Sequence, residues 1–378
     1  MAACSPTTER DGASYEAPTG TTPMIPVLVI DASSATSGSE AVAPSKAVGA
    51  PLLGSVGHVS LDDDGNIYIA DYQQTRVFVY DAGGRFLMSI GSSGEGPGEF
   101  QIPVNVIARG DTVYVYDNRL FRISAFRKAD GSFVRSFNVK LDEWTPRTVI
   151  GYTDSHAVAI FSPPVSFDES DVGIQNEEVR LVDLSGEDSH AIWTTPGTDW
   201  KRIEVNGMRM LRNMPLSFNS SCTMKGDLGY CGYSSAVRVN AFTLDGDSVD
   251  VAYVPAARRK VTDEERMAIL DPITNPALRE ALVVPAEHPA FAGYIVVDDA
   301  GRVWIRRSAS DEAGTEYWII DPDNHRVLSV TLAGRATLSY AGGGRAVAAV
   351  RAADGTQSVV VYSIGEFSVD RAAESAQK

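Results

Sequence analysis

The clearest pattern in the chain is a run of short apolar segments separated by turn residues, best developed over residues 56–90. β-Branched and aromatic residues fill the segments 56–61, 66–70, 76–80 and 85–90. Turns rich in Asp and Gly follow the first segment and the third. Because such turns favour tight reversals, this pattern predicts four short antiparallel strands.

The same unit recurs along the chain. The first turn of the unit lies at Gly65, and similar turns follow at Gly110, Ser155, Asp227, Gly301 and Gly344. Three of the five intervals are 43 to 45 residues long, and the other two, of 72 and 74 residues, contain insertions. Repeated four-stranded units of this length are typical of a β-propeller. We therefore predict an all-β fold, a six-bladed β-propeller whose sheets stack face to face in a closed ring.

The sixth unit lies too near the C-terminus to contain four strands comfortably. A lone apolar run at residues 24–30 precedes the first unit, and we predict that it supplies the missing outermost strand and closes the ring. The propeller would then span residues 24–371, with a linker at 31–50 and a tail at 372–378.

Residues 261–284 depart from the strand pattern. Thr262 and Glu265 have the spacing of a capping box, Pro272 would end the first helix, and Asn275-Pro276 would begin a second. This segment predicts a short helical insertion between blades 4 and 5.

The first fifty residues have a different composition, with 32 of them Ala, Ser, Thr, Pro or Gly. Such a segment has little apolar surface to bury, so residues 1–23 are interpreted as a disordered tether. Its start, Met1-Ala2-Ala3-Cys4, resembles the end of a bacterial lipoprotein signal. That resemblance implies lipidation at Cys4, whereas the alternative is a solvated thiol in a flexible tail.

The charge balance narrows the possible partners. The chain has 33 basic and 49 acidic residues and a formal net charge of −16. Nucleic acids and anionic membrane surfaces are bound through clustered Lys and Arg, so we expect no nucleic-acid partner. No run of 18 apolar residues is present, and membrane contact is expected only through a lipid anchor.

The spacing of two cysteines indicates a possible disulfide, which would depend on whether the protein is exported. Cys222 and Cys231 are nine residues apart around a Gly-rich turn, a spacing that would place them opposite each other in a hairpin. In an exported protein they would form a disulfide and leave Cys4 for lipid. In a cytoplasmic protein both would be small buried residues.

Several motifs resemble a known family. The segments 94–103, 64–71 and 76–80 are similar to the signature of six-bladed, NHL-repeat-like propellers, including bacterial propeller lipoproteins. The resemblance implies an exported binding module in the periplasm or cell envelope, tethered by lipid. Its ligand would be a protein, a peptide or a glycan, and no cofactor is expected.

An alternative function comes from residues near the predicted start of each inner strand. His58, Asn105, Arg147, Asn213 and His288 would all lie near one rim of the central channel. This resembles the way in which propeller lyases and gluconolactonase-like propellers build sites from several blades. The alternative is therefore a metal-dependent lactonase or lyase using Ca²⁺ or Zn²⁺, although scattered surface residues would give the same pattern. The Asp-rich turn at 62–66 also allows Ca²⁺, but a hairpin turn explains it more simply.

Overall fold

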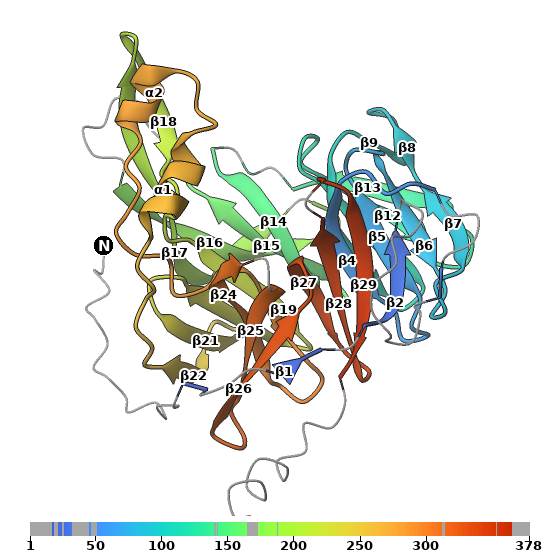
Figure 1. Cartoon of the computed structure of the whole chain (residues 1–378). Coiled ribbons are helices and arrows are strands. Elements are labelled where there is room, and N and C mark those ends of the chain that lie inside the picture. The colour runs from blue at the N-terminus through green and yellow to red at the C-terminus, as the bar shows by residue number, and fades with distance from the viewer. Residues whose placement is uncertain are drawn as a thin grey trace, which may run out of the picture.

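The computed structural model describes residues 17–18, 22–24, 26–31, 45–46, 51–139, 141, 143–164, 173–186, 188–311, 314–352 and 354–364. Within these residues the chain forms six sheets arranged as the blades of a propeller (Figure 1). The predicted tail and the lipid-site residue Cys4 lie outside the described residues. The prediction of a six-bladed, all-β fold is confirmed.

The first three blades follow one another along the chain. Blade 1 contains β4 (Val56–Leu61), β5 (Ile67–Asp71), β6 (Arg76–Tyr80) and β7 (Phe86–Ile90). A two-stranded connection, β8 (Ser92–Ser93) and β9 (Glu99–Phe100), leads to blade 2, with β10 (Pro103–Arg109), β11 (Thr112–Asp117), β12 (Arg122–Arg127) and β13 (Phe133–Asn138). Blade 3 has five strands, β14 (Thr145–Tyr152), β15 (His156–Ser162), β16 (Gly173–Asp183), β17 (Ser189–Val205) and β18 (Met208–Asn213).

The last three blades complete the ring. Blade 4 contains β19 (Ser220–Lys225), β20 (Leu228–Tyr233), β21 (Val237–Thr243) and β22 (Ser248–Val254). Helices α1 (Asp263–Leu270) and α2 (Pro276–Ala281) then precede blade 5, with β23 (Ala292–Val297), β24 (Val303–Asp311), β25 (Gly314–Asp321) and β26 (Arg326–Leu332). Blade 6 contains β27 (Arg335–Gly342), β28 (Arg345–Arg351) and β29 (Gln357–Ser363).

The fourth strand of blade 6 comes from the other end of the chain. Strand β2 (Pro26–Asp31) pairs antiparallel with β29, with Ile30 opposite Val359. It occupies the outer position that the sequence prediction gave to residues 24–30. A short strand β3 (Ser45–Lys46) continues the sheet in parallel, inside the segment predicted as a linker.

The boundary of the predicted tether needs correction. Strand β1 (Thr22–Pro23) lies inside the segment 1–23 but pairs in parallel with β26 of blade 5. The backbone N–H of Met24 also donates to the Thr331 carbonyl. Backbone hydrogen bonding, which needs no apolar side chain, therefore attaches this segment to the ring before β2 begins.

Burial between blades holds the ring together. Each pair of neighbouring blades encloses its own apolar cluster, so there are six such clusters around the ring. Consecutive inner strands contact one another, and β27 of the last blade contacts β4 of the first. Since each sheet has two apolar faces, closure of the ring covers both faces of every blade at its inner strands.

The two large insertions lie on one face of the ring. The β17–β18 hairpin and the α1–α2 segment both belong to connections that run from the outer part of one blade to the inner strand of the next. They therefore lie at the end of the ring where the inner strands begin. Figure 1 shows α1, α2 and β18 standing together at the upper left.

Helix α1 begins as the sequence predicts. The Thr262 side chain accepts a hydrogen bond from the Glu265 backbone N–H, and the Glu265 side chain accepts from the Thr262 N–H. Asn275 caps α2 in a similar way, through the Leu278 N–H. The predicted helical insertion between blades 4 and 5 is confirmed.

Buried carboxylates hold the connections at this end of the ring. Asp71 accepts hydrogen bonds from the backbone N–H groups of Gly54, Ser55, Gln73 and Gln74, and its side chain is fully buried. Asp117 does the same in blade 2, accepting from backbone N–H groups on both of its neighbouring connections. These carboxylates are structural, because their oxygens are occupied by otherwise unpaired backbone donors.

The closing strand gives a direct test of this architecture. Ile30 is fully buried between blades 6 and 1, whereas Val27 of the same strand is 49% exposed. We expect Ile30→Ala to lower the free energy of unfolding by about 2 to 5 kcal/mol, because it leaves a cavity in the seam. Val27→Ala should change it by less than about 0.5 kcal/mol. Urea unfolding of both variants measures this, and equal effects would show that β2 does not seal the ring.

Candidate functional site

Three of the predicted rim residues lie on inner strands of successive blades. His58 is on β4, Asn105 on β10 and Arg147 on β14, each close to the start of its strand. Each lies beside an irregularity in the pairing with the second strand of its blade. The structure thus places them at the end of the ring that carries the two insertions.

Each of these residues has a role in joining blades or in the core. The His58 Nδ1–H donates to the Val106 carbonyl of the next blade, at 3.0 Å. The Arg147 guanidinium pairs with Glu177 at 2.9 Å and donates to the Ser220 carbonyl of blade 4 at 3.2 Å. Asn105 is buried, and its Oδ1 has no hydrogen-bond partner among the described residues.

The other two residues predicted at the channel rim, Asn213 and His288, do not lie on inner strands. Asn213 is exposed at the end of β18, where it pairs with Trp200, so it lies on the outer strand of blade 3 and the channel-rim prediction is wrong for it. The reason is the β17–β18 hairpin, which lengthens blade 3 and moves the start of β19 to Ser220. His288 is buried in the connection before β23, next to the helical insertion.

A basic pocket of about 380 Å³ contains His288. The residues that line it include Arg259, Arg306, Arg307 and Arg335, together with Glu265 and His288. The pocket lies between α1 and the beginnings of β23, β25 and β27. None of these arginines is among the predicted site residues, because they are spread over residues 259–335 and share no local spacing.

Within this pocket, Glu265 is already engaged. Arg259 binds its carboxylate through both terminal nitrogens, the Thr262 N–H donates to it, and His288 Nε2 lies 3.2 Å from it. These interactions hold the pKa of Glu265 far below its usual range, with Arg259 as the main cause. Glu265 is therefore an ionised carboxylate that positions Arg259.

A second pocket of about 420 Å³ lies between the two insertions and is mostly apolar. Its walls come from β17, from the connection at 214–218 and from the segment after α2. They include Ile203, Met214, Leu216, Phe218, Ala281 and Val283, with the charged Asp199, Lys201 and Arg202 also in the lining. We call this pocket the apolar cleft. Leu216 has a φ of 57°, in the left-handed region that a Leu residue rarely adopts.

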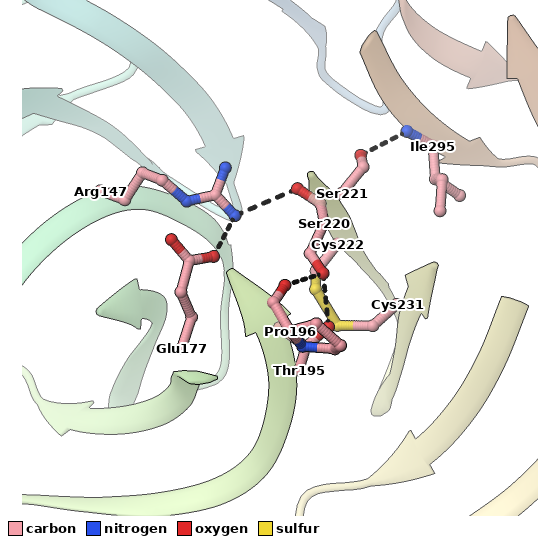
Figure 2. The surroundings of a disulfide bond; sticks show 9 residues. All are labelled: Arg147, Glu177, Thr195, Pro196, Ser220, Ser221, Cys222, Cys231 and Ile295. Atoms are coloured by element: carbon pink, nitrogen blue, oxygen red, sulfur yellow. Dashed lines mark hydrogen bonds and ion pairs between the residues drawn. A yellow bond between two sulfur atoms is a disulfide. The ribbon is translucent and has the colours of Figure 1, made fainter. Parts of the chain in front are cut away.

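The predicted cysteine pair is joined in the structure. Cys222 and Cys231 face each other on β19 and β20 and form a disulfide, with Cα atoms 4.2 Å apart (Figure 2). Both side chains are buried in the seam between blades 3 and 4. Figure 2 also shows the Ser220 and Ser221 side chains next to the bond, reaching Pro196 and Ile295 respectively. The disulfide thus braces an inner strand that contacts both adjoining blades.

No group of three or more His, Cys, Asp or Glu side chains lies together as metal ligands would, among the residues that the structure describes. In the turn at 62–66, Asp62 accepts hydrogen bonds from Asn66 and from the Tyr68 hydroxyl, and Lys128 lies 3.0 Å from it. Asp298 occupies the same place in blade 5 and bonds Arg302 and Trp304. The hairpin interpretation of this motif accounts for these contacts. The metal-dependent alternative stays a prediction.

No helix of the described chain is long and apolar enough to cross a membrane.

The comparisons with known proteins agree on the fold. A family described as "6-bladed beta-propeller" matches residues 50–150. A "Putative exported protein" from Bacteroides fragilis has a similar structure, with a TM-score of 0.52 and 10% identity, covering 93% of this chain and 98% of that chain. No curated protein matches the sequence.

Two further solved structures are similar at lower scores. One is a member of the duf4221 family from Bacteroides vulgatus, with a TM-score of 0.49 and 11% identity over 82% of this chain and 92% of that chain. The other is virginiamycin B lyase from Staphylococcus aureus, with a TM-score of 0.46 and 9% identity over 82% and 94%.

His58 predicts a pH dependence of stability. Burial lowers its pKa from the ordinary 6.5 to about 4, against the smaller opposing effect of the Val106 carbonyl. The unfolded chain therefore binds a proton before the folded chain does as the pH falls below 6.5, and up to about 3 kcal/mol of stability is lost by pH 4. Urea midpoints at a series of pH values measure this loss.

The matched variants are His58→Gln, which should flatten the acid side of that profile, and His190→Gln at an exposed position, which should leave it unchanged. If His58→Gln retains the wild-type pH profile, His58 is not held neutral by burial.

The disulfide predicts a response to reductant. Replacing Cys222 and Cys231 together by Ala should lower the free energy of unfolding by about 2 to 3 kcal/mol, because the bond restricts the unfolded chain. The melting temperature of the wild type should fall to that of the double variant when reductant is added. An unchanged wild-type melting temperature in reductant would contradict the prediction.

Proposed function

We propose that this chain is an exported binding module that holds a protein segment by a large apolar side chain in the apolar cleft. The observation that carries the proposal is the meeting of the two insertions. The β17–β18 hairpin and the α1–α2 segment pack against each other through Ile203, Val205 and Leu278. A repeat fold needs neither insertion for its core, and together they enclose a cleft.

The lining of the cleft indicates the kind of ligand. Val283 in its wall is 67% exposed. Exposed apolar side chains around a concave surface are typical of protein-binding sites. A glycan would instead need a dense set of hydrogen-bonding groups, so a protein or peptide ligand is favoured over a glycan.

The backbone at Leu216 supports a binding role. The left-handed conformation places a Leu side chain in the cleft wall at an energetic cost. The turn is held by Ser217, whose backbone N–H and hydroxyl both donate to the Met214 carbonyl. Phe218 is supported from behind by Arg258, whose guanidinium lies 5.0 Å from the ring centre. These contacts order the cleft wall without a ligand, which would lower the entropic cost of binding.

The proposal includes export. Disulfides persist outside the reducing cytoplasm, and the Cys222–Cys231 bond is buried in a seam on which the ring depends. The similar Bacteroides fragilis protein is also described as exported. Lipid attachment at Cys4, with the domain held in the cell envelope or periplasm, completes the proposal.

A peptide-display selection tests the binding role. Peptides selected on the full chain should carry large apolar residues, and Val283→Asp should weaken their binding about tenfold or more, because it places a charge in the apolar wall. Leu52→Asp is the matched control, since Leu52 is 64% exposed but lies outside the cleft, before β4. Isothermal titration with the selected peptides gives the affinities.

Equal affinities for both variants would contradict the proposed site. Selection of no peptide, together with binding of a glycan in an array, would contradict the protein-ligand proposal.

A further inference from the structure

The basic pocket contrasts with the rest of the molecule. The chain has a net charge of −16, yet four arginines and one histidine face one pocket of about 380 Å³ with a single glutamate. Like charges repel, so such a grouping costs free energy unless something compensates for it. The size of this free-energy cost depends on which of these cations already have an anionic partner.

Arg259 has its partner within the pocket. It binds Glu265 through two hydrogen bonds and also donates to His288 Nε2 at 2.7 Å. Glu265, the single acidic group among the lining residues, is therefore already paired with Arg259. This pair contributes little net charge to the pocket.

The other three arginines have no ion pair among the described residues of the chain. Arg306 donates to the Thr337 hydroxyl at 3.3 Å. Arg307 donates to the Ala290 carbonyl, and its guanidinium lies 4.0 Å from the centre of the Trp318 ring. Arg335 begins β27 at the opposite wall and is exposed.

One acidic group outside the pocket acts on Arg307. Glu316 interacts electrostatically with Arg307, but its carboxylate accepts hydrogen bonds from the Trp318 indole N–H and the Ser329 hydroxyl. Burial lowers the pKa of Arg307, which shows that its charge is poorly solvated. The direct partners of this guanidinium are neutral, and Glu316 attracts it without forming an ion pair.

We propose that the basic pocket binds a small anionic ligand through a phosphate or carboxylate group. Guanidinium groups present two parallel N–H donors, which match the spacing of two oxygens in either anion. Arg306, Arg307 and Arg335 reach the pocket from two different blades, so the ligand would bridge blades 5 and 6. This site is separate from the apolar cleft, and its ligand need not be a peptide.

The test measures binding to the full chain at low ionic strength by isothermal titration. Inorganic phosphate, pyrophosphate and citrate are the probes, with the first two representing phosphate ligands and citrate representing carboxylates. We expect at least one of them to bind with one-to-one stoichiometry and to raise the melting temperature.

Matched variants locate the site. Arg335→Gln should weaken binding about tenfold or more, and Arg335→Lys should weaken it less, because Lys keeps the charge but loses the paired donors. Arg306→Gln should act like Arg335→Gln. Arg85→Gln is the control, since Arg85 is exposed on blade 1 and pairs with Asp81.

Two outcomes would overturn the proposal. One is the absence of binding by all three probes up to millimolar concentration while the wild type remains folded. The other is binding that Arg85→Gln weakens as much as Arg335→Gln does, which would indicate general charge attraction. Because Val283→Asp should leave anion binding unchanged, failure of the peptide proposal would not be mistaken for failure of this one.

Discussion

Burial of both faces of every sheet is the constraint on which the rest of this structure depends. A single four-stranded blade cannot cover its own apolar faces, so each blade is stable only between two neighbours. The six apolar clusters between blades meet this requirement all the way round. The last seam, between blades 6 and 1, includes Leu28 and Ile30 from the N-terminal strand. The two ends of the described chain are therefore joined within one sheet, and closure needs no covalent bond.

Because the blades serve mainly to close the ring, variation is tolerated in the connections between them. The two long insertions both lie at the end of the ring where inner strands begin. The apolar cleft lies between them, and the basic pocket, of similar size and opposite character, lies beside α1. One is bounded by Leu216, Phe218 and Val283, and the other by arginines from blades 5 and 6. The two proposed sites would therefore lie on one face, outside the core between the blades.

The fold could be predicted in detail from the sequence because turn residues close together in the chain define each repeat. Turn residues at Gly65, Gly110 and Gly301 lie between the first and second strands of their blades in the structure, all with positive φ. The helix start at the Thr262 capping box could be predicted equally well, because the box depends on residues only three positions apart. The site was less predictable. Asn213 was assigned to the channel rim, whereas the length of the β17–β18 hairpin moves it to an outer strand.

The sequence by itself thus determined the number of blades, the helical insertion and the facing positions of Cys222 and Cys231, since each follows from turn chemistry and short-range spacing. Tertiary structure decided which polar residues are structural and which line a pocket. Asp71 and Asp62 look alike in the sequence as turn acids, yet Asp71 joins two connections through backbone N–H groups, whereas Asp62 also binds the Asn66, Tyr68 and Lys128 side chains. The arginines at 259, 306, 307 and 335 come together only because the ring places blades 5 and 6 beside α1. Such juxtapositions depend on contacts distant in sequence, and no local pattern encodes them.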